Sequence, residues 1–325
     1  MADATDIQCR MSSSLSSSRL RRLYPWIGIA IFSVAAWLVY RALRQYSVEQ
    51  IVASLGAISL RHLALGGLFA AGSYLCKTGN DLLAVRYTGS DLAYPKVALA
   101  SFTALSIGQT LGVAAFSSGA VRYRFYSAWG LSAGDVARIL VFCGLTVLLG
   151  LASVAGIACL LGTRLVGATF GAPPLAVGAA GVLLLTAIAG YLGLAALVQH
   201  PIRIRRFVLP LPPLRLALGQ VALGTVDFML VAAVLHQMLS ASSEVGFFAV
   251  AAGYVAGNTA GIISHVPGGL GVIEAVLLAL VPGANVVGAL VAFRAVYYLI
   301  PFALGTLLFA VCEYLRRQGR LRAAG

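Results

Sequence analysis

Long apolar segments separated by short polar ones run along almost the whole chain. About 20 apolar residues in a helix cross the hydrocarbon core of a bilayer, so several of these segments are long enough to span a membrane. The pattern therefore predicts an all-α polytopic membrane protein. The segments cover residues 23–41, 62–86, 97–118, 136–162, 174–198, 215–239, 245–265, 268–281 and 284–312.

The two ends of the chain are its polar parts. Residues 1–22 contain runs of serine and several arginines, and we expect a disordered basic tail there, with a second basic tail at residues 316–325. The first apolar segment has the length of a signal peptide, but Arg41 and Arg44 follow it without a small-residue cleavage site. We interpret that segment as an uncleaved anchor, so residues 23–315 form one transmembrane domain.

Composition excludes most soluble classes of protein. The chain is 60% hydrophobic and 10% charged, whereas soluble domains carry about 25% charged residues. The net charge of +13 comes from basic residues at segment ends, where they set topology and contact anionic lipid, so we expect no nucleic-acid partner. The five cysteines and four histidines show no metal-ligand spacing, and no nucleotide-binding loop is present, so we expect no metal and no cofactor.

The basic residues distinguish two topologies. If every apolar segment crossed, starting inside, loops 119–135 and 199–215 and the C-terminus would place most arginines outside, against the positive-inside rule. If residues 97–118 and 245–281 are instead re-entrant hairpins, both termini are cytoplasmic and few basic residues lie outside. We therefore predict about six spanning helices and two re-entrant hairpins, broken near residues 106–109 and 265–269. The spanning segments are residues 23–41, 62–86, 136–162, 174–198, 215–239 and 284–312.

This topology also contains an internal repetition. Segments that begin at residues 23, 62, 97 and 136 are followed by segments that begin at 174, 215, 245 and 284. Each half then consists of helix, helix, hairpin and helix, and the second half begins on the opposite side of the membrane. The spacing predicts an inverted repeat of residues 23–162 and 174–312, in which a binding site lies near the two broken elements.

The second break has an unusual composition for an apolar region. Its proline and glycines allow the backbone to turn and a helix to restart near residue 269, and the free amides at that helix start can hold an anion. Glu274 falls early in this helix, either as a capping carboxylate or as a functional one. Asn258, just before the break, is placed to line a cavity. The residues of the break are Pro267, Gly268, Gly269 and Gly271.

Two groups of arginines are candidates for binding a lipid headgroup. Arg294 lies inside the last apolar segment near Tyr298. It can form a buried ion pair with Glu274 or clamp a phosphate with its planar fork of donors, and the two are compatible if phosphate competes for the arginine. Arg122, Arg124 and Tyr126 follow the first predicted hairpin and suit a site at headgroup level, although such residues also mark ordinary membrane interfaces.

Three more charged residues lie within apolar segments. Lys77 and Asp81 are four residues apart on one helix face, so a neutral pair is the simplest interpretation and a proton or ion relay is the alternative. Asp227 has no local partner, and the sequence leaves open a link to Lys77 or to an arginine.

Three blocks of the chain, in this order, resemble the signature of one known family. They are residues 118–126 with 130–132, residues 267–274 and residues 294–301. The family is the lysylphosphatidylglycerol synthase transmembrane-region family, which includes the flippase domain of the multiple peptide resistance factor and the shorter YbhN-like bacterial proteins. The resemblance covers about residues 25 to 315, and its most specific part is the Pro-Gly-Gly-Leu-Gly-x-x-Glu block.

The resemblance implies a bacterial inner-membrane protein that moves phospholipid or lipid-linked headgroups between leaflets, as a flippase or scramblase. Its partners would be membrane lipids, above all anionic phospholipids. Bifunctional members carry a cytosolic aminoacyl-transferase domain after the membrane part, and this sequence ends at Gly325, so we do not expect an enzyme. The alternative is a non-catalytic subunit that assists a separate lipid-modifying enzyme. A membrane enzyme acting on polyprenyl-phosphate lipids fits less well, because the loops are short.

Overall fold

Apart from segments 23–41 and 97–118, the apolar segments fold as helices whose ends lie within about five residues of the predicted bounds. The computed structural model describes residues 52, 55–56, 58–111, 114–198, 202–204, 207–209, 211–241, 244–264, 272–280 and 286–318. The predicted segment 23–41 lies outside these residues. The elements are α3 (Leu60–Tyr87), α4 (Tyr94–Leu111), α5 (Ala114–Tyr126), the 3-10 turn η1 (Ser127–Trp129), α6 (Ala133–Leu161), α7 (Thr163–Phe170), α8 (Pro174–Leu197), β1 (Ile202–Ile204), β2 (Phe207–Leu209), α9 (Leu214–Ser240), α10 (Phe247–Ser264), α11 (Val272–Leu280), α12 (Val286–Arg294), the π-helical turn η3 (Ala295–Leu299) and α13 (Ile300–Arg317).

Four of the described helical spans are long and apolar enough to cross a membrane. They are Ala133–Leu161, Pro174–Leu197, Leu214–Ser240 and Val287–Arg316. Helix α3 is also long, with 28 residues, but polar side chains in its second half lower its hydropathy. The short antiparallel hairpin of β1 and β2 joins α8 to α9. The chain is therefore an all-α polytopic membrane protein, as the pattern of apolar segments predicted.

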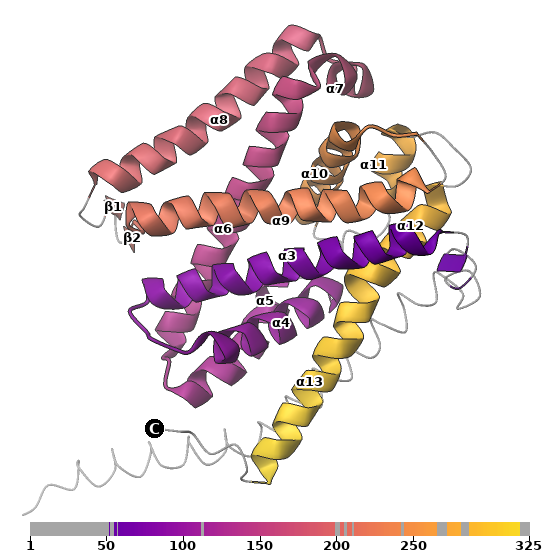
Figure 1. Cartoon of the computed structure of the whole chain (residues 1–325). Helices are drawn as coiled ribbons and strands as arrows, with labels where there is room; N and C mark the ends of the chain where they lie inside the picture. Colours follow the sequence, from indigo (N-terminus) through magenta and orange to yellow (C-terminus); the bar gives the residue numbers. More distant parts are fainter. Residues whose placement is uncertain are drawn as a thin grey trace, which may run out of the picture. The chain divides into compact units, whose positions relative to one another are not determined.

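Helices α3 and α9 lie side by side and run antiparallel (Figure 1). At one end, His62 Nδ1 of α3 lies 2.9 Å from Gln237 Oε1 of α9. At the other end, a Cβ added at Gly219 of α9 would contact the side chain of Leu83 of α3. Early residues of α3 thus meet late residues of α9, and the reverse.

The helices repeat in the same order along the chain. Helix α9 begins at Leu214, 154 residues after α3 begins at Leu60. Helix α10 begins 153 residues after α4, and both have 18 residues. The contacts repeat as well, because α4 packs on α13 as α10 packs on α6, and α3 packs on α6 as α9 packs on α12. Since the corresponding helices α3 and α9 run antiparallel, this is the arrangement that the predicted inverted repeat requires.

Each predicted hairpin contains a pair of packed helices, α4 with α5 and α10 with α11. The first is not broken where the sequence suggested: α4 continues through residues 106–109 to Leu111, so that prediction is wrong. A Cβ added at Gly108 would lie 2.8 Å from Cβ of Ser118 on α5. Glycine here permits close packing of two helices rather than a turn. The second predicted break lies outside the described residues, between Ser264 at the end of α10 and Val272 at the start of α11.

Helices α6 and α9 cross where two glycines meet. A Cβ at Gly150 would lie 2.5 Å from the carbonyl oxygen of Gly224, and a Cβ at Gly224 would lie 2.7 Å from the carbonyl oxygen of Thr146. Backbone atoms within a helix cannot move aside as a flexible side chain can. This crossing therefore depends on both glycines, as close helix contacts in membranes often do.

We expect Gly150→Ala to destabilise the protein by about 1–3 kcal/mol, because the added methyl group forces α6 and α9 apart. Thermal unfolding of the purified protein in detergent measures the effect. Gly144→Ala is the matched control, since it lies on the same helix and its Cβ would meet nothing within 4 Å. Equal unfolding temperatures for the two variants would contradict the close crossing.

Candidate functional site

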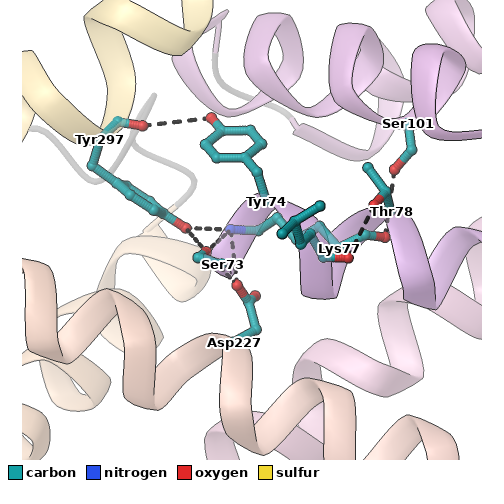
Figure 2. A network of polar contacts seen from close by, with 8 residues as sticks. Ser73, Tyr74, Lys77, Thr78, Ser101, Asp227 and Tyr297 are labelled. Atoms are coloured by element: carbon teal, nitrogen blue, oxygen red, sulfur yellow. Dashed lines mark hydrogen bonds and ion pairs between the residues drawn. The ribbon is translucent and has the colours of Figure 1, made fainter. Parts of the chain in front are cut away.

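Four polar side chains from three elements meet in the central cluster, which we define as Ser73 and Lys77 of α3, Asp227 of α9 and Tyr297 of η3. Figure 2 shows them pointing toward one another. The Lys77 ammonium lies 3.3 Å from Asp227 Oδ1 and donates to Ser73 Oγ at 3.1 Å. It also donates to the Tyr297 hydroxyl. The Ser73 hydroxyl donates to Asp227 and lies 2.9 Å from the Tyr297 hydroxyl, so the cluster is continuous.

Two tyrosine side chains lie close to the Lys77 ammonium. It lies 4.8 Å from the ring centroid of Tyr297 and 5.2 Å from that of Tyr74. The Tyr74 hydroxyl donates to the backbone carbonyl of Tyr297 at 3.4 Å, which ties α3 to the π-helical turn. Single π-turns within helices occur often at functional sites. The Tyr74 ring offers the lysine cation–π stabilisation, and the Tyr297 hydroxyl accepts its hydrogen bond; neither contact depends on Asp227.

The central cluster lies where the two halves of the fold meet. Ser73 and Asp227 each lie 13 residues after the first residue of their helix, at Leu60 and Leu214, so they occupy corresponding positions and contact each other. By the same spacing, Lys77 corresponds to Val231. The first half thus has Ser73 where the second half has Asp227, and the second half has Val231 where the first half has Lys77. Each half therefore contributes one charge of the ion pair.

A second ion pair lies one helical turn further along α3 and is sealed from solvent. Arg122 of α5 donates from Nε and from Nη2 to the two carboxylate oxygens of Asp81, each at 2.8 Å. The Tyr126 hydroxyl and the Cys143 thiol also donate to this carboxylate, both at 3.2 Å. The side chains of Arg122 and Asp81 are only 2% and 1% exposed, against 15% and 11% for Lys77 and Asp227. The Arg122–Asp81 pair fastens α5 to α3, and the Cys143 contact adds α6, whereas the Lys77–Asp227 pair is less completely buried.

The interpretation of Lys77 and Asp81 as a pair within one helix is wrong, because each has a partner on another helix. A cation placed four residues before an anion is the less favourable order for such a pair. The link between Lys77 and Asp227 that the sequence left open is present. The neutralisation of these charges was foreseeable, but the choice of partner depends on how α3, α5 and α9 pack.

The other candidate arginines lie in two different surroundings. Arg124 of α5 donates to both carboxylate oxygens of Glu313 on α13, at 2.8 and 3.0 Å. This pair is partly exposed, so it contributes about 0–1 kcal/mol to stability. Arg294, at the end of α12, is buried, and its guanidinium carbon lies 5.1 Å from the ring centroid of Tyr298. The first predicted hairpin is longer than expected, because Arg122, Arg124 and Tyr126 lie within α5 and not after it.

The candidate residues of the second break are described only in part. Asn258 lies on α10 and is partly buried. Glu274 is the third residue of α11, early in the helix as expected, but its side chain lies outside the described residues. So does the segment with Pro267, Gly268, Gly269 and Gly271, together with any pairing of Glu274 with Arg294.

A neutral polar network also links four helices and was not foreseen from the sequence. Thr146 of α6 donates to Asn80 Oδ1 of α3 at 2.9 Å, and Gln220 of α9 donates to Thr146 at 3.2 Å. The Tyr191 hydroxyl of α8 donates to Gln220 at 2.5 Å. The signal in the sequence that could have predicted this network was the presence of single neutral polar residues within apolar segments. Such residues often form hydrogen bonds between helices, which stabilise membrane bundles. Across the part of the chain that the structure describes, no group of His, Cys, Asp or Glu side chains could hold a metal ion.

Two known proteins are similar to this chain over most of its length. The uncharacterized protein slr0712 of Synechocystis sp. is 32% identical over 303 residues, which cover 91% of this chain and 93% of the relative. The inner membrane protein YbhN of Escherichia coli is 31% identical over 290 residues, which cover 87% of this chain and 86% of the relative. No family model matches the chain. Neither relative's name states an activity or a substrate.

Proposed function

The chain belongs to the YbhN-like family of inner-membrane proteins, and on this premise we propose that it moves phospholipid or lipid-linked headgroups between the leaflets of the membrane, as a flippase or scramblase. In this proposal, six helices cross the membrane, two helical pairs are re-entrant, and both termini are cytoplasmic. The headgroup passes between the two halves of the fold while its acyl chains stay in lipid.

The central cluster is the observation that carries the proposal. Charged side chains within the membrane are costly, and they commonly mark a substrate or ion pathway. Lys77 is partly exposed, Asp227 is buried with 11% of its side chain exposed, and both lie where the two halves meet. In transporters built from inverted repeats, the binding site lies at the same kind of junction. Lysine is a suitable partner for the phosphate that phospholipid headgroups share.

The candidate arginines divide between two roles in this proposal. Both nitrogens of the Arg122 fork that face Asp81 are engaged by its carboxylate, so we assign Arg122 to holding α5 in place. Arg124 and Arg294 remain candidates for the lipid phosphate at other depths of the path. The amides of the second break, with Glu274 and Asn258, would form the corresponding part of the path in the second half.

Reconstitution into liposomes tests this function. Fluorescently labelled phosphatidylglycerol and phosphatidylethanolamine are placed in both leaflets, and the fraction open to a membrane-impermeant quencher is followed over time. We expect liposomes with the protein to exchange label faster than empty ones. Arg294→Gln should slow the exchange roughly tenfold or more, since a charged hydrogen bond contributes about 1.5–3 kcal/mol. Arg86→Gln, an exposed change at the end of α3, is the control.

The outcomes separate the two candidate functions. Exchange no faster than in empty liposomes, for anionic and zwitterionic lipids alike, would sink the transport proposal. If the protein did not speed lipid exchange but co-purified with a lipid-modifying enzyme, the chain would instead be the non-catalytic subunit that the sequence also allows.

A further inference from the structure

The contacts of the Lys77 ammonium in the central cluster differ in whether they depend on the charge of Asp227. The Lys77 ammonium has three polar contacts, Asp227, Ser73 and Tyr297, of which only Asp227 carries a charge. The hydroxyls of Ser73 and Tyr297 and the ring of Tyr74 would stay with the ammonium if Asp227 became neutral. Lys77 can therefore remain charged and held in place without its anion.

The surroundings of Asp227 provide no second cation in the contacts described. On α3, besides Lys77, the nearby titratable groups are Tyr74 and Cys76, and η3 and α10 provide Tyr297, Tyr298 and Tyr254. Three other helices pack on α9. Helix α6 has one acid and one base at its start, and these two pair with each other, while α8 has no charged residue. Helix α12 ends at Arg294, which lies against Tyr298. The charge state of Asp227 thus acts mainly on Lys77.

We infer that Asp227 is a proton-binding site coupled to a phosphate site on Lys77, so that the protein takes up one proton for each lipid phosphate it binds. This inference rests on the proposed function and specifies its ligand and its coupling. When Asp227 is ionised, it occupies Lys77. When a proton from the aqueous phase bonds to a carboxylate oxygen of Asp227, the ion pair is lost, and the Lys77 ammonium, still protonated, pairs with the phosphate anion.

Charge balance is the physical reason for this coupling. The cluster carries one positive and one negative charge before the exchange. After it, the lysine and the phosphate carry them and Asp227 is neutral. A phosphate that entered without a proton would leave two anions beside one cation, and the low dielectric constant of the interior makes such an excess costly. Release of the phosphate allows Asp227 to lose its proton and pair with Lys77 again.

The comparison of the two ion pairs supports this assignment to Lys77 and Asp227. Arg122 and Asp81 are joined by two hydrogen bonds of 2.8 Å and are almost fully enclosed. Lys77 and Asp227 are joined by one contact of 3.3 Å and are more exposed. Of these two pairs, only Lys77–Asp227 combines greater exposure with a single contact between the charged groups, as an exchange of partners requires.

Binding measurements in detergent test the inference without transport. The wild-type protein is titrated with short-chain phosphatidylglycerol, and with dimethyl phosphate in a parallel arm, in weak buffer with a pH dye. Both ligands are phosphodiesters that stay singly charged near neutral pH, so any proton taken up binds to the protein. We expect one proton to be taken up per lipid bound, and the affinity to rise about tenfold for each unit by which pH falls. Equal proton uptake with dimethyl phosphate would support the coupling and identify the phosphate group as the part recognised.

Two variants and one control complete the test. Asp227→Asn should bind with an affinity that does not change with pH, and Lys77→Met should lose the binding at every pH. Asp91→Asn, in the exposed loop between α3 and α4, should keep the wild-type dependence on pH. Lipid binding by the wild type without proton uptake, or no binding at all, would overturn the inference. Lipid exchange in liposomes is measured separately, so the proposed function can stand when this inference fails.

Discussion

Asp81→Ala is expected to lower the free energy of unfolding by about 3–5 kcal/mol, a large share of the total for a protein that is only marginally stable. The change leaves the Arg122 guanidinium, 2% exposed, without the carboxylate that accepts its two hydrogen bonds. It also removes the acceptor of Tyr126. Thermal unfolding and the yield of monodisperse protein in detergent measure the loss.

A double variant separates the buried charge from the packing around it. Asp81→Leu combined with Arg122→Met replaces the pair by apolar side chains, and we expect it to recover most of the stability, because such replacements are often neutral. Asp91→Ala, an exposed carboxylate on the loop that follows α3, is the control and should change little. If Asp81→Ala unfolded at the wild-type temperature, the sealed pair would not be what holds α5.

Lys77→Met is expected to slow lipid exchange in liposomes roughly 10- to 100-fold, because it removes the cation of the central cluster and a charged hydrogen bond contributes about 1.5–3 kcal/mol. It also leaves the carboxylate of Asp227 in the cluster without its cation. Rates are compared at equal amounts of folded, reconstituted protein. Arg86→Met, near the exposed end of the same helix, should retain the wild-type rate.

Here, too, a double variant distinguishes a structural role from a transport role. Lys77→Met with Asp227→Leu removes both charges, so the protein should fold as well as the wild type. Its lipid exchange should stay as slow as that of Lys77→Met alone. Wild-type exchange by this double variant would show that the central cluster is only a structural ion pair.

Much of the fold followed from hydrophobic segments and basic residues. The predicted segment 174–198 is helix α8 at Pro174–Leu197, and segment 215–239 is α9 at Leu214–Ser240. The region of segment 97–118 contains two packed helices, α4 and α5, which extend to Tyr126, and the glycine that suggested the break lies inside α4. Glycine has two uses in a membrane helix, close packing and turning, and the sequence does not distinguish them.

The charged members of the candidate site could be predicted from the sequence, but its neutral members, Ser73 and Tyr297, and the choice of ion pairs could not. Lys77, Asp81 and Asp227 stood out because charges are rare in apolar segments. Tyr297 did not, because a tyrosine within an apolar helix is ordinary there, and Glu313 lies near a segment end where charge is expected. Partner choice depends on which side chains face each other across different helices, and neighbours in sequence do not determine it.

The sequence by itself determined that this chain is a membrane protein, where its helices lie, and which few residues carry charge into them. Each of these follows from local composition, since the cost of a polar group in lipid is paid residue by residue. Only the tertiary structure decided that Arg122 is sealed against Asp81 while Lys77 and Asp227 meet in a more open cluster. That difference arises from the antiparallel contact of α3 with α9 and the packing of α5. These contacts join residues far apart in the sequence, such as Ser73 and Asp227, which are 154 positions apart, and they depend on how whole helices fit together.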